Sequence, residues 1–89
     1  MSNNTYNGWH NYETWRVNME LIDPIDPRDM MADGMDLADF ADYFREYSED
    51  VISCSGEGLA LDYARAFLSR VNWREIARAK LAAYDLEAA

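Results

Sequence analysis

The segment from residue 36 to residue 53 restricts the possible folds of this chain more than any other. At about 100° per residue, its apolar side chains fall on one arc of an α-helix and its carboxylates fall on the opposite arc. Such a helix is stable only when other elements cover its apolar arc. The apolar arc consists of Leu37, Phe40, Ala41, Phe44, Tyr47, Val51 and Ile52. The opposite arc consists of Asp39, Asp42, Glu46, Glu49 and Asp50, with Arg45 near its edge.

Residues 12–22 are expected to form a helix as well. Apolar side chains recur there at steps of three and four residues, which is the spacing of one helical face. Asn11 is the expected N-cap, and Pro24 disfavours helical backbone at the preceding residue, which ends the helix. Asp26 before Pro27 then predicts a short helical turn through about residue 32. The apolar face of this first helix consists of Tyr12, Trp15, Met19 and Ile22.

The last third of the chain contains two more helical patterns. Residues 59–69 carry apolar side chains on two adjoining faces, and so wide an apolar surface predicts a helix that is central in the packing. The last helix is expected to begin after Asn72, because Asn72 as N-cap and Glu75 three residues later form a capping-box pattern. Its apolar face runs to Tyr84 and includes Trp73, which is expected to pack against the same core as the first helix.

These patterns predict an all-α fold, a small single-domain bundle of three to four helices over residues 1–89, with residues 1–8 and 86–89 frayed. A chain of this length suffices for one domain, and folding buries about 60–65% of the surface that the unfolded chain exposes. Hydrophobic residues make up 49% of the chain and aromatic residues 13%, which argues against disorder despite the high charge. No alternating pattern is long enough to require a strand.

The net charge of −9 is concentrated in one part of the chain. Residues 20–57 carry −10, residues 58–89 carry +1, and residues 1–19 are neutral. An excess of carboxylates opposes direct binding to nucleic acid or to an anionic membrane, whose phosphates require Lys and Arg. The same charge suits a protein partner with a basic surface, and a general solubilising role is the alternative interpretation.

The sequence shows no motif of an enzyme, a cofactor site, a metal site or a secreted protein. It has no phosphate-binding Gly-rich loop, zinc-ligand spacing, serine-nucleophile motif or calcium-binding loop. The single cysteine, Cys54, allows no internal disulfide, and no signal peptide or membrane-spanning run is expected, which fits the cytoplasm of a host cell. Cys54 is expected in a flexible loop of residues 53–58 as an incidental thiol, and His10, the only histidine, in a capping or packing role.

Two stretches near the ends of the chain carry distinctive motifs. Residues 8–15 read Gly-Trp-His-Asn-Tyr-Glu-Thr-Trp, and residues 72–77 read Asn-Trp-Arg-Glu-Ile-Ala. Together they resemble an uncharacterised family of small proteins of bacteriophages and bacteria, which pairs Gly-Trp-x-Asn-Tyr-Glu-Thr-Trp with a later Asn-Trp-x-Glu-Ile-Ala. The resemblance covers about 20 residues and implies a phage or mobile-element origin. It implies no catalytic activity and no substrate.

The carboxylates opposite the apolar arc of residues 36–53 are candidate partner-binding residues. From residue 39 to residue 50 a helix rises by about 16 Å, and carboxylates over that length can imitate phosphates that recur every ~3.4 Å along one nucleic-acid strand. The corresponding function is a non-enzymatic inhibitor that occupies the basic nucleic-acid-binding surface of a host protein or complex, such as a CRISPR effector or a restriction system. A solvated helix face is the alternative interpretation. The candidate residues are Asp39, Asp42, Glu46, Glu49 and Asp50.

Two other surfaces provide alternative functions. Trp9 and Tyr12 can anchor a structural or accessory protein-interaction module, although helical spacing and the cap at Asn11 favour a structural role for this motif. Three arginines spaced by four residues can contact nucleic-acid phosphates. With a net charge of −9 we favour, instead, internal pairing of these arginines with the acidic middle segment. The three arginines are Arg70, Arg74 and Arg78.

Overall fold

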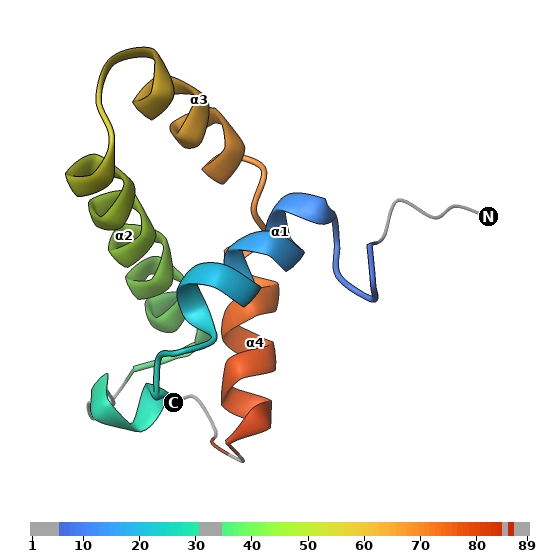
Figure 1. Ribbon diagram of the computed structural model, residues 1–89. Helices are drawn as coiled ribbons and strands as arrows, with labels where there is room; N and C mark the ends of the chain where they lie inside the picture. Colours follow the sequence, from blue (N-terminus) through green and yellow to red (C-terminus); the bar gives the residue numbers. More distant parts are fainter. Residues whose placement is uncertain (1–5, 31–34, 85, 87–89) are drawn as a thin grey trace.

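The computed structural model describes residues 6–30, 35–84 and 86. Within these residues the fold is all-α, with four α-helices around one core and no strand, as predicted (Figure 1). The remaining parts of the ends predicted to be frayed, and the end of the predicted turn near residue 32, lie outside the described residues. The elements are α1 (Tyr12–Val17), η1 (Asn18–Ile22), η2 (Pro27–Met30), α2 (Leu37–Ser55), α3 (Gly58–Leu68) and α4 (Trp73–Ala83).

Residues 6–9 form a tight turn where the sequence suggested a frayed end. The N–H of Tyr6 donates to the carbonyl of Trp9 at 2.7 Å, and the N–H of Trp9 donates back to the carbonyl of Tyr6 at 2.7 Å. Gly8, at φ 87°, adopts the left-handed backbone that glycine tolerates without a steric penalty. The turn places the Tyr6 ring 5.1 Å from the Trp15 ring.

The helix predicted over residues 12–22 is present, but its second half is a π-helix. α1 continues directly into η1, and the N–H of Asp23 donates to the carbonyl of Asn18, five residues back, at 2.8 Å. A π turn holds more residues than an α turn, so the side chains after it are rotated relative to the 3.6-residue pattern. Ile22 is fully buried as predicted, whereas Met19, predicted on the same face, is 46% exposed.

α2 is the central helix of the core. Asp36 caps it, and Asp36 and Asp39 form a complete capping box in which each carboxylate accepts from the other residue's N–H. Phe40 and Phe44 are fully buried, as the predicted apolar arc requires. α2 packs mainly against α4, whose buried apolar residues are Ile76, Ala77 and Leu81.

The prediction that the third helix is central in the packing is wrong. α3 contacts α2 and α1 near the edge of the molecule, and Leu68 at its C-terminal end is its one buried residue (Figure 1). The molecule is flat, 39 × 38 × 19 Å, and most of the side chains in its core come from the other elements. Leu59 is consequently 65% exposed and Tyr63 is 69% exposed.

The connection after η1 is held by charged side chains. The Asp26 carboxylate accepts from the N–H of Arg28 at 2.9 Å and from its guanidinium at 2.7 Å, and these bonds lower the pKa of Asp26 to about 2. The Lys80 ammonium on α4 donates to the carbonyl of Asp23 at 3.0 Å, and burial lowers the pKa of this lysine. The α4 helix is thereby joined to the end of η1.

Ser48 lies on the buried side of α2, where the sequence pattern identified only apolar residues. Its side chain is fully buried, and within the described residues its hydroxyl has no hydrogen-bond partner. An unpaired buried hydroxyl costs about 1–3 kcal/mol relative to water.

Replacing Ser48 with alanine is therefore expected to stabilise the protein. We expect the free energy of unfolding in urea to rise by about 1–2 kcal/mol, because the unpaired hydroxyl is removed and alanine favours helix. Ser53→Ala is the matched control, since Ser53 is exposed on the same helix. It reports helix propensity alone, so equal gains for the two variants would contradict the buried-hydroxyl explanation.

Candidate functional site

The outer side of α2 carries the predicted carboxylates. All five are exposed, so the structure places them together on one surface. At the edge of this surface, Glu49 borders a pocket that Arg65 of α3 and Trp73 of α4 also line. Asp39 also has a structural role, because its carboxylate accepts from the N–H of Asp36 at 3.0 Å within the capping box. We call these five residues the acidic face: Asp39, Asp42, Glu46, Glu49 and Asp50.

Arg45 lies at the edge of the acidic face and faces three of its carboxylates. Its guanidinium is 3.8 Å from Asp42, 3.9 Å from Glu46 and 3.6 Å from Glu49. Exposed ion pairs of this kind contribute about 0–1 kcal/mol each, so a protein partner can replace them at little cost. One arginine against five carboxylates leaves the acidic face strongly negative.

Two exposed tyrosines accompany the acidic face. Tyr43 is 43% exposed and Tyr47 is 37% exposed, and they lie one helical turn apart on α2. Tyr47 was predicted on the buried arc, so its exposure is a correction. The sequence analysis did not single out Tyr43, although at about 100° per residue it falls within roughly 20° of Asp50. Tyrosine is enriched at protein interfaces, where its ring supplies area at little entropic cost.

The two motifs near the ends of the chain meet at Thr14. Its hydroxyl, fully buried, donates to the side-chain oxygen of Asn11 at 2.6 Å and accepts from the N–H of Asn72 at 2.9 Å. Asn11 caps α1 by accepting from the N–H of Thr14 at 2.9 Å, and Asn72 caps α4 by accepting from the N–H of Glu75 at 3.1 Å. One threonine thus connects the N-caps of two helices, through a hydrogen bond to a residue 58 positions later in the sequence.

Further contacts join the same two motifs. The Asn11 amide donates to the carbonyl of Arg70 at 2.8 Å, and the Glu75 carboxylate accepts from the N–H of His10 at 2.9 Å. Glu75 was predicted to accept from the N–H of Asn72 in a capping box; that N–H donates to Thr14 instead. These contacts support a structural role for the motif residues, and they give the His10 backbone a defined partner.

The three arginines predicted to share one face do not do so. Arg70 lies in the connection between α3 and α4, while Arg74 and Arg78 are on α4. The Arg70 guanidinium is 3.2 Å from the Glu13 carboxylate, so it pairs with the N-terminal motif and not with the acidic middle segment. The basic stripe that direct nucleic-acid binding requires is therefore interrupted.

Aromatic residues of the first motif contact each other and Tyr6, which precedes the motif. Ring centroids of Tyr6 and Tyr12 are 5.1 Å apart, those of Tyr12 and Trp15 are 5.7 Å apart, and Tyr12 meets Phe67 of α3 at 6.2 Å. Trp9 is half-buried against the core. Tyr12, predicted in the core, is 36% exposed, because it covers the edge between α1 and α3.

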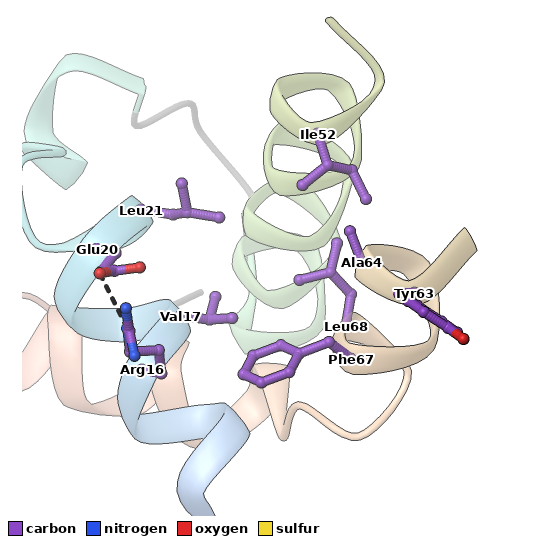
Figure 2. Close-up of a pocket in the computed structure, with 9 residues that line it drawn as sticks. All are labelled: Arg16, Val17, Glu20, Leu21, Ile52, Tyr63, Ala64, Phe67 and Leu68. Atoms are coloured by element: carbon purple, nitrogen blue, oxygen red, sulfur yellow. Dashed lines mark ion pairs between the residues drawn. The ribbon is translucent and has the colours of Figure 1, made fainter. Parts of the chain in front are cut away.

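An apolar groove of about 430 Å³ lies between α1 with η1 on one side and α3 on the other (Figure 2). Its walls include Val17 and Leu21 opposite Phe67, and Ile52 of α2 lies at one end. One polar pair borders it, Arg16 and Glu20, whose charged groups are 2.9 Å apart. The sequence analysis did not predict this groove, since it depends on how α3 sits against α1.

The other candidate groups show no catalytic arrangement. Cys54 is exposed, and it belongs to the last turn of α2 because this helix extends to Ser55, two residues further than predicted. In the described part of the chain, no three His, Cys, Asp or Glu side chains are placed to hold a metal ion. None of the described helices has both the length and the apolar character needed to cross a membrane.

Comparison of the chain with protein-family models, with curated proteins and with solved structures finds no match. The resemblance of the two end motifs therefore remains an expectation.

Proposed function

We propose that this protein is a non-enzymatic inhibitor that binds the basic nucleic-acid-binding surface of a host protein or complex through the acidic face of α2. The observation that carries the proposal is the exposure of all five carboxylates on one side of a 19-residue helix. A CRISPR effector and a restriction system are targets of the appropriate kind, because both hold nucleic acid in positively charged channels. The expected location is the cytoplasm of a host cell.

Tyr43 and Tyr47 make the match to a nucleic-acid-binding surface more specific. Proteins that hold single strands combine a basic groove with aromatic side chains on which bases stack. The outer side of α2 offers the complement of both features, carboxylates for Lys and Arg and two exposed rings for stacking. Arginine also stacks on tyrosine rings, so the two kinds of contact reinforce each other.

The test is a capture experiment with the tagged full-length protein in host lysate, washed at low and then at high salt. We expect a nucleic-acid-binding protein to be captured at low salt, to be released by high salt, and to be displaced by added DNA or RNA. Salt releases the complex because exposed charges are screened beyond about 8–10 Å at physiological ionic strength. Competition by nucleic acid distinguishes occupancy of the binding surface from contact elsewhere on the target.

The matched variants are two double charge reversals. Glu46→Lys with Asp50→Lys changes the acidic face beside the two tyrosines, and Asp29→Lys with Asp62→Lys makes the same change in net charge at exposed positions elsewhere. We expect the first pair to abolish capture and the second to retain most of it, with helicity unchanged in both. Equal loss in both would mean that net charge alone drives binding, and full retention in the first would refute the acidic-face proposal.

The second candidate function is an accessory module that docks through the aromatic residues of the N-terminal motif. Its supporting observation is the exposure of Tyr12 at 36%, next to Tyr6, which precedes the motif and is 40% exposed, whereas Trp9, the other predicted anchor, is half-buried. Apolar docking is insensitive to added salt, unlike binding through the acidic face. A captured partner that survives the high-salt wash, and that has no nucleic-acid function, would favour this alternative.

A further inference from the structure

A pocket of about 270 Å³ lies where α2, α3 and the start of α4 meet. The side chains that line it include Arg45 and Glu49 of α2, Arg65 and Leu68 of α3, and Trp73, the first residue of α4. We call it the junction pocket. Its volume is close to the lower end of the ~300–1,000 Å³ of small-molecule sites, so a small ligand suits it better than a protein segment.

The charged side chains that line the junction pocket sum to +1, in a chain whose net charge is −9. The guanidinium groups of Arg45 and Arg65 contribute two positive charges, and the carboxylate of Glu49 contributes one negative charge. Arg45 is 3.6 Å from Glu49, so these two charges offset each other. Arg65 has no carboxylate within 4 Å among the described residues. A ligand with a single negative charge therefore neutralises the pocket.

The hydrogen-bonding groups of the junction pocket favour a ligand that accepts hydrogen bonds. The Ser69 hydroxyl lines the pocket, but it already donates to the carbonyl of Ala66 at 2.6 Å. The backbone N–H of Val71, also in the lining, donates to the carbonyl of Leu68 at 3.1 Å. The guanidinium groups thus supply most of the remaining donors. A carboxylate accepts two parallel N–H bonds from one guanidinium, which makes this pairing both strong and directional.

The rest of the lining is apolar and includes an aromatic ring. Leu68 and Val71 are buried side chains at the pocket, and Trp73 beside them is half-buried. An aromatic ligand gains from Trp73 both the burial of apolar area and the offset or edge-on contact that aromatic pairs prefer. An arginine side chain can also lie over the face of such a ring. The apolar part of the ligand is therefore expected to be aromatic.

We propose that the junction pocket binds a small aromatic carboxylate, a planar ring system that carries a single negative charge. The carboxylate pairs with Arg65, and the ring contacts Trp73, Leu68 and Val71. Glu49 repels a second negative charge, so phosphate monoesters, which carry about −1.5 to −2 at pH 7, bind less tightly. The site does not depend on the proposed inhibitor function, although Glu49 belongs to the acidic face as well.

The size of the ligand sets the expected affinity. Two fused rings with one carboxylate contain about 13 non-hydrogen atoms, and ligands of that size with ordinary efficiency have dissociation constants of about 0.1–1 mM. Loss of the pairing with Arg65 is expected to raise the dissociation constant about tenfold, as for a hydrogen bond between charged groups.

An NMR titration of the full-length protein with naphthoate, two fused rings bearing one carboxylate, tests the proposal. The chain has three tryptophans, and Trp73→Phe identifies which of the three indole N–H signals belongs to Trp73. We expect this signal to shift and to saturate with a dissociation constant of about 0.1–1 mM. Naphthylmethanol has the same rings without the charge, and we expect it to bind about tenfold more weakly.

The matched variants are Arg65→Gln and Arg78→Gln. Arg78 is exposed like Arg65 and also has no carboxylate within 4 Å in the described part of the chain, but it does not line the junction pocket. We expect Arg65→Gln to raise the dissociation constant of naphthoate about tenfold, and Arg78→Gln to change it by less than about twofold. Both positions are exposed, so both variants are expected to fold normally, which circular dichroism checks.

Several results overturn the proposal. One is the absence of a saturable shift at Trp73, including the case in which naphthoate shifts only Val17 and Leu21 and thus occupies the apolar groove. Equal binding of naphthylmethanol means that the charge is not recognised, and equal effects of the two arginine variants mean that Arg65 does not hold the carboxylate. Tighter binding of inorganic phosphate or cytidine monophosphate than of naphthoate contradicts selection for a single negative charge.

Discussion

Replacing Phe44 with alanine is expected to lower the free energy of unfolding by about 3–5 kcal/mol, because a fully buried phenylalanine leaves both lost apolar contact and a cavity. Phe44 is surrounded by Phe40, with ring centroids 6.5 Å apart, and by the α4 residues that α2 covers. A domain of this size has a total stability of about 5–15 kcal/mol, so the variant is expected to lose a large share of its stability.

The neighbouring Tyr43→Ala is the control for Phe44→Ala. Its ring lies 6.1 Å from that of Phe44 but is 43% exposed on the outer side of α2. We expect a loss of less than about 1 kcal/mol, as for most surface substitutions. Urea denaturation of both variants measures the difference, and similar losses at the two positions would show that α2 is not oriented as described.

Replacing Thr14 with valine is expected to lower the free energy of unfolding by about 2–3 kcal/mol, although the two side chains have nearly the same shape. Valine keeps the methyl group and replaces the hydroxyl with a second methyl, which cannot accept from the N–H of Asn72 or donate to Asn11. The N–H of Asn72 is then left without a partner at the start of α4. Its amide hydrogen is expected to exchange with solvent faster than in the unmodified protein, which NMR detects at that single position.

Thr14→Ser separates the hydroxyl from the rest of the side chain. Serine retains both hydrogen bonds and loses one methyl group, so the expected cost is about 0.8 kcal/mol. The expected order of stability is therefore threonine, serine, valine, so the most apolar of the three residues gives the least stable protein. If the valine variant is as stable as the serine variant, the hydroxyl of Thr14 does not connect the two end motifs in the way described.

The connection at Thr14 bears on function as well as on stability. Residues that make the two motifs distinctive, such as Asn11, Thr14 and Glu75, have hydrogen-bond partners inside the protein. They hold α1 against the start of α4. Partner binding is therefore better sought on surfaces outside the motifs, such as the acidic face of α2.

Sequence periodicity predicted the four helices correctly, because each helix is specified by residues within it and by the cap next to it. The caps at Asn11, Asp36 and Asn72 were expected, and each accepts the predicted backbone N–H. The apolar and acidic arcs of α2 were separated correctly at most positions for the same local reason. The predicted burial of Met19 and Tyr47 was wrong. Met19 lies in the π-helix η1, and Tyr47 lies on a part of α2 that no other helix covers fully. Helical periodicity predicts neither feature, because both depend on contacts with other parts of the fold.

The sequence by itself determined the helical class, the helix starts and the negative surface of α2, because these depend on contacts within a few residues and on charge. Only the tertiary structure decided which apolar surface is covered. The α2–α4 pair and η1 fill most of a core that is too small to include every helix fully, so α3, the most apolar helix by composition, is left at the edge. The groove beside it and the bonds of Thr14 to Asn72 join residues far apart in the chain, and no local pattern encodes such pairings.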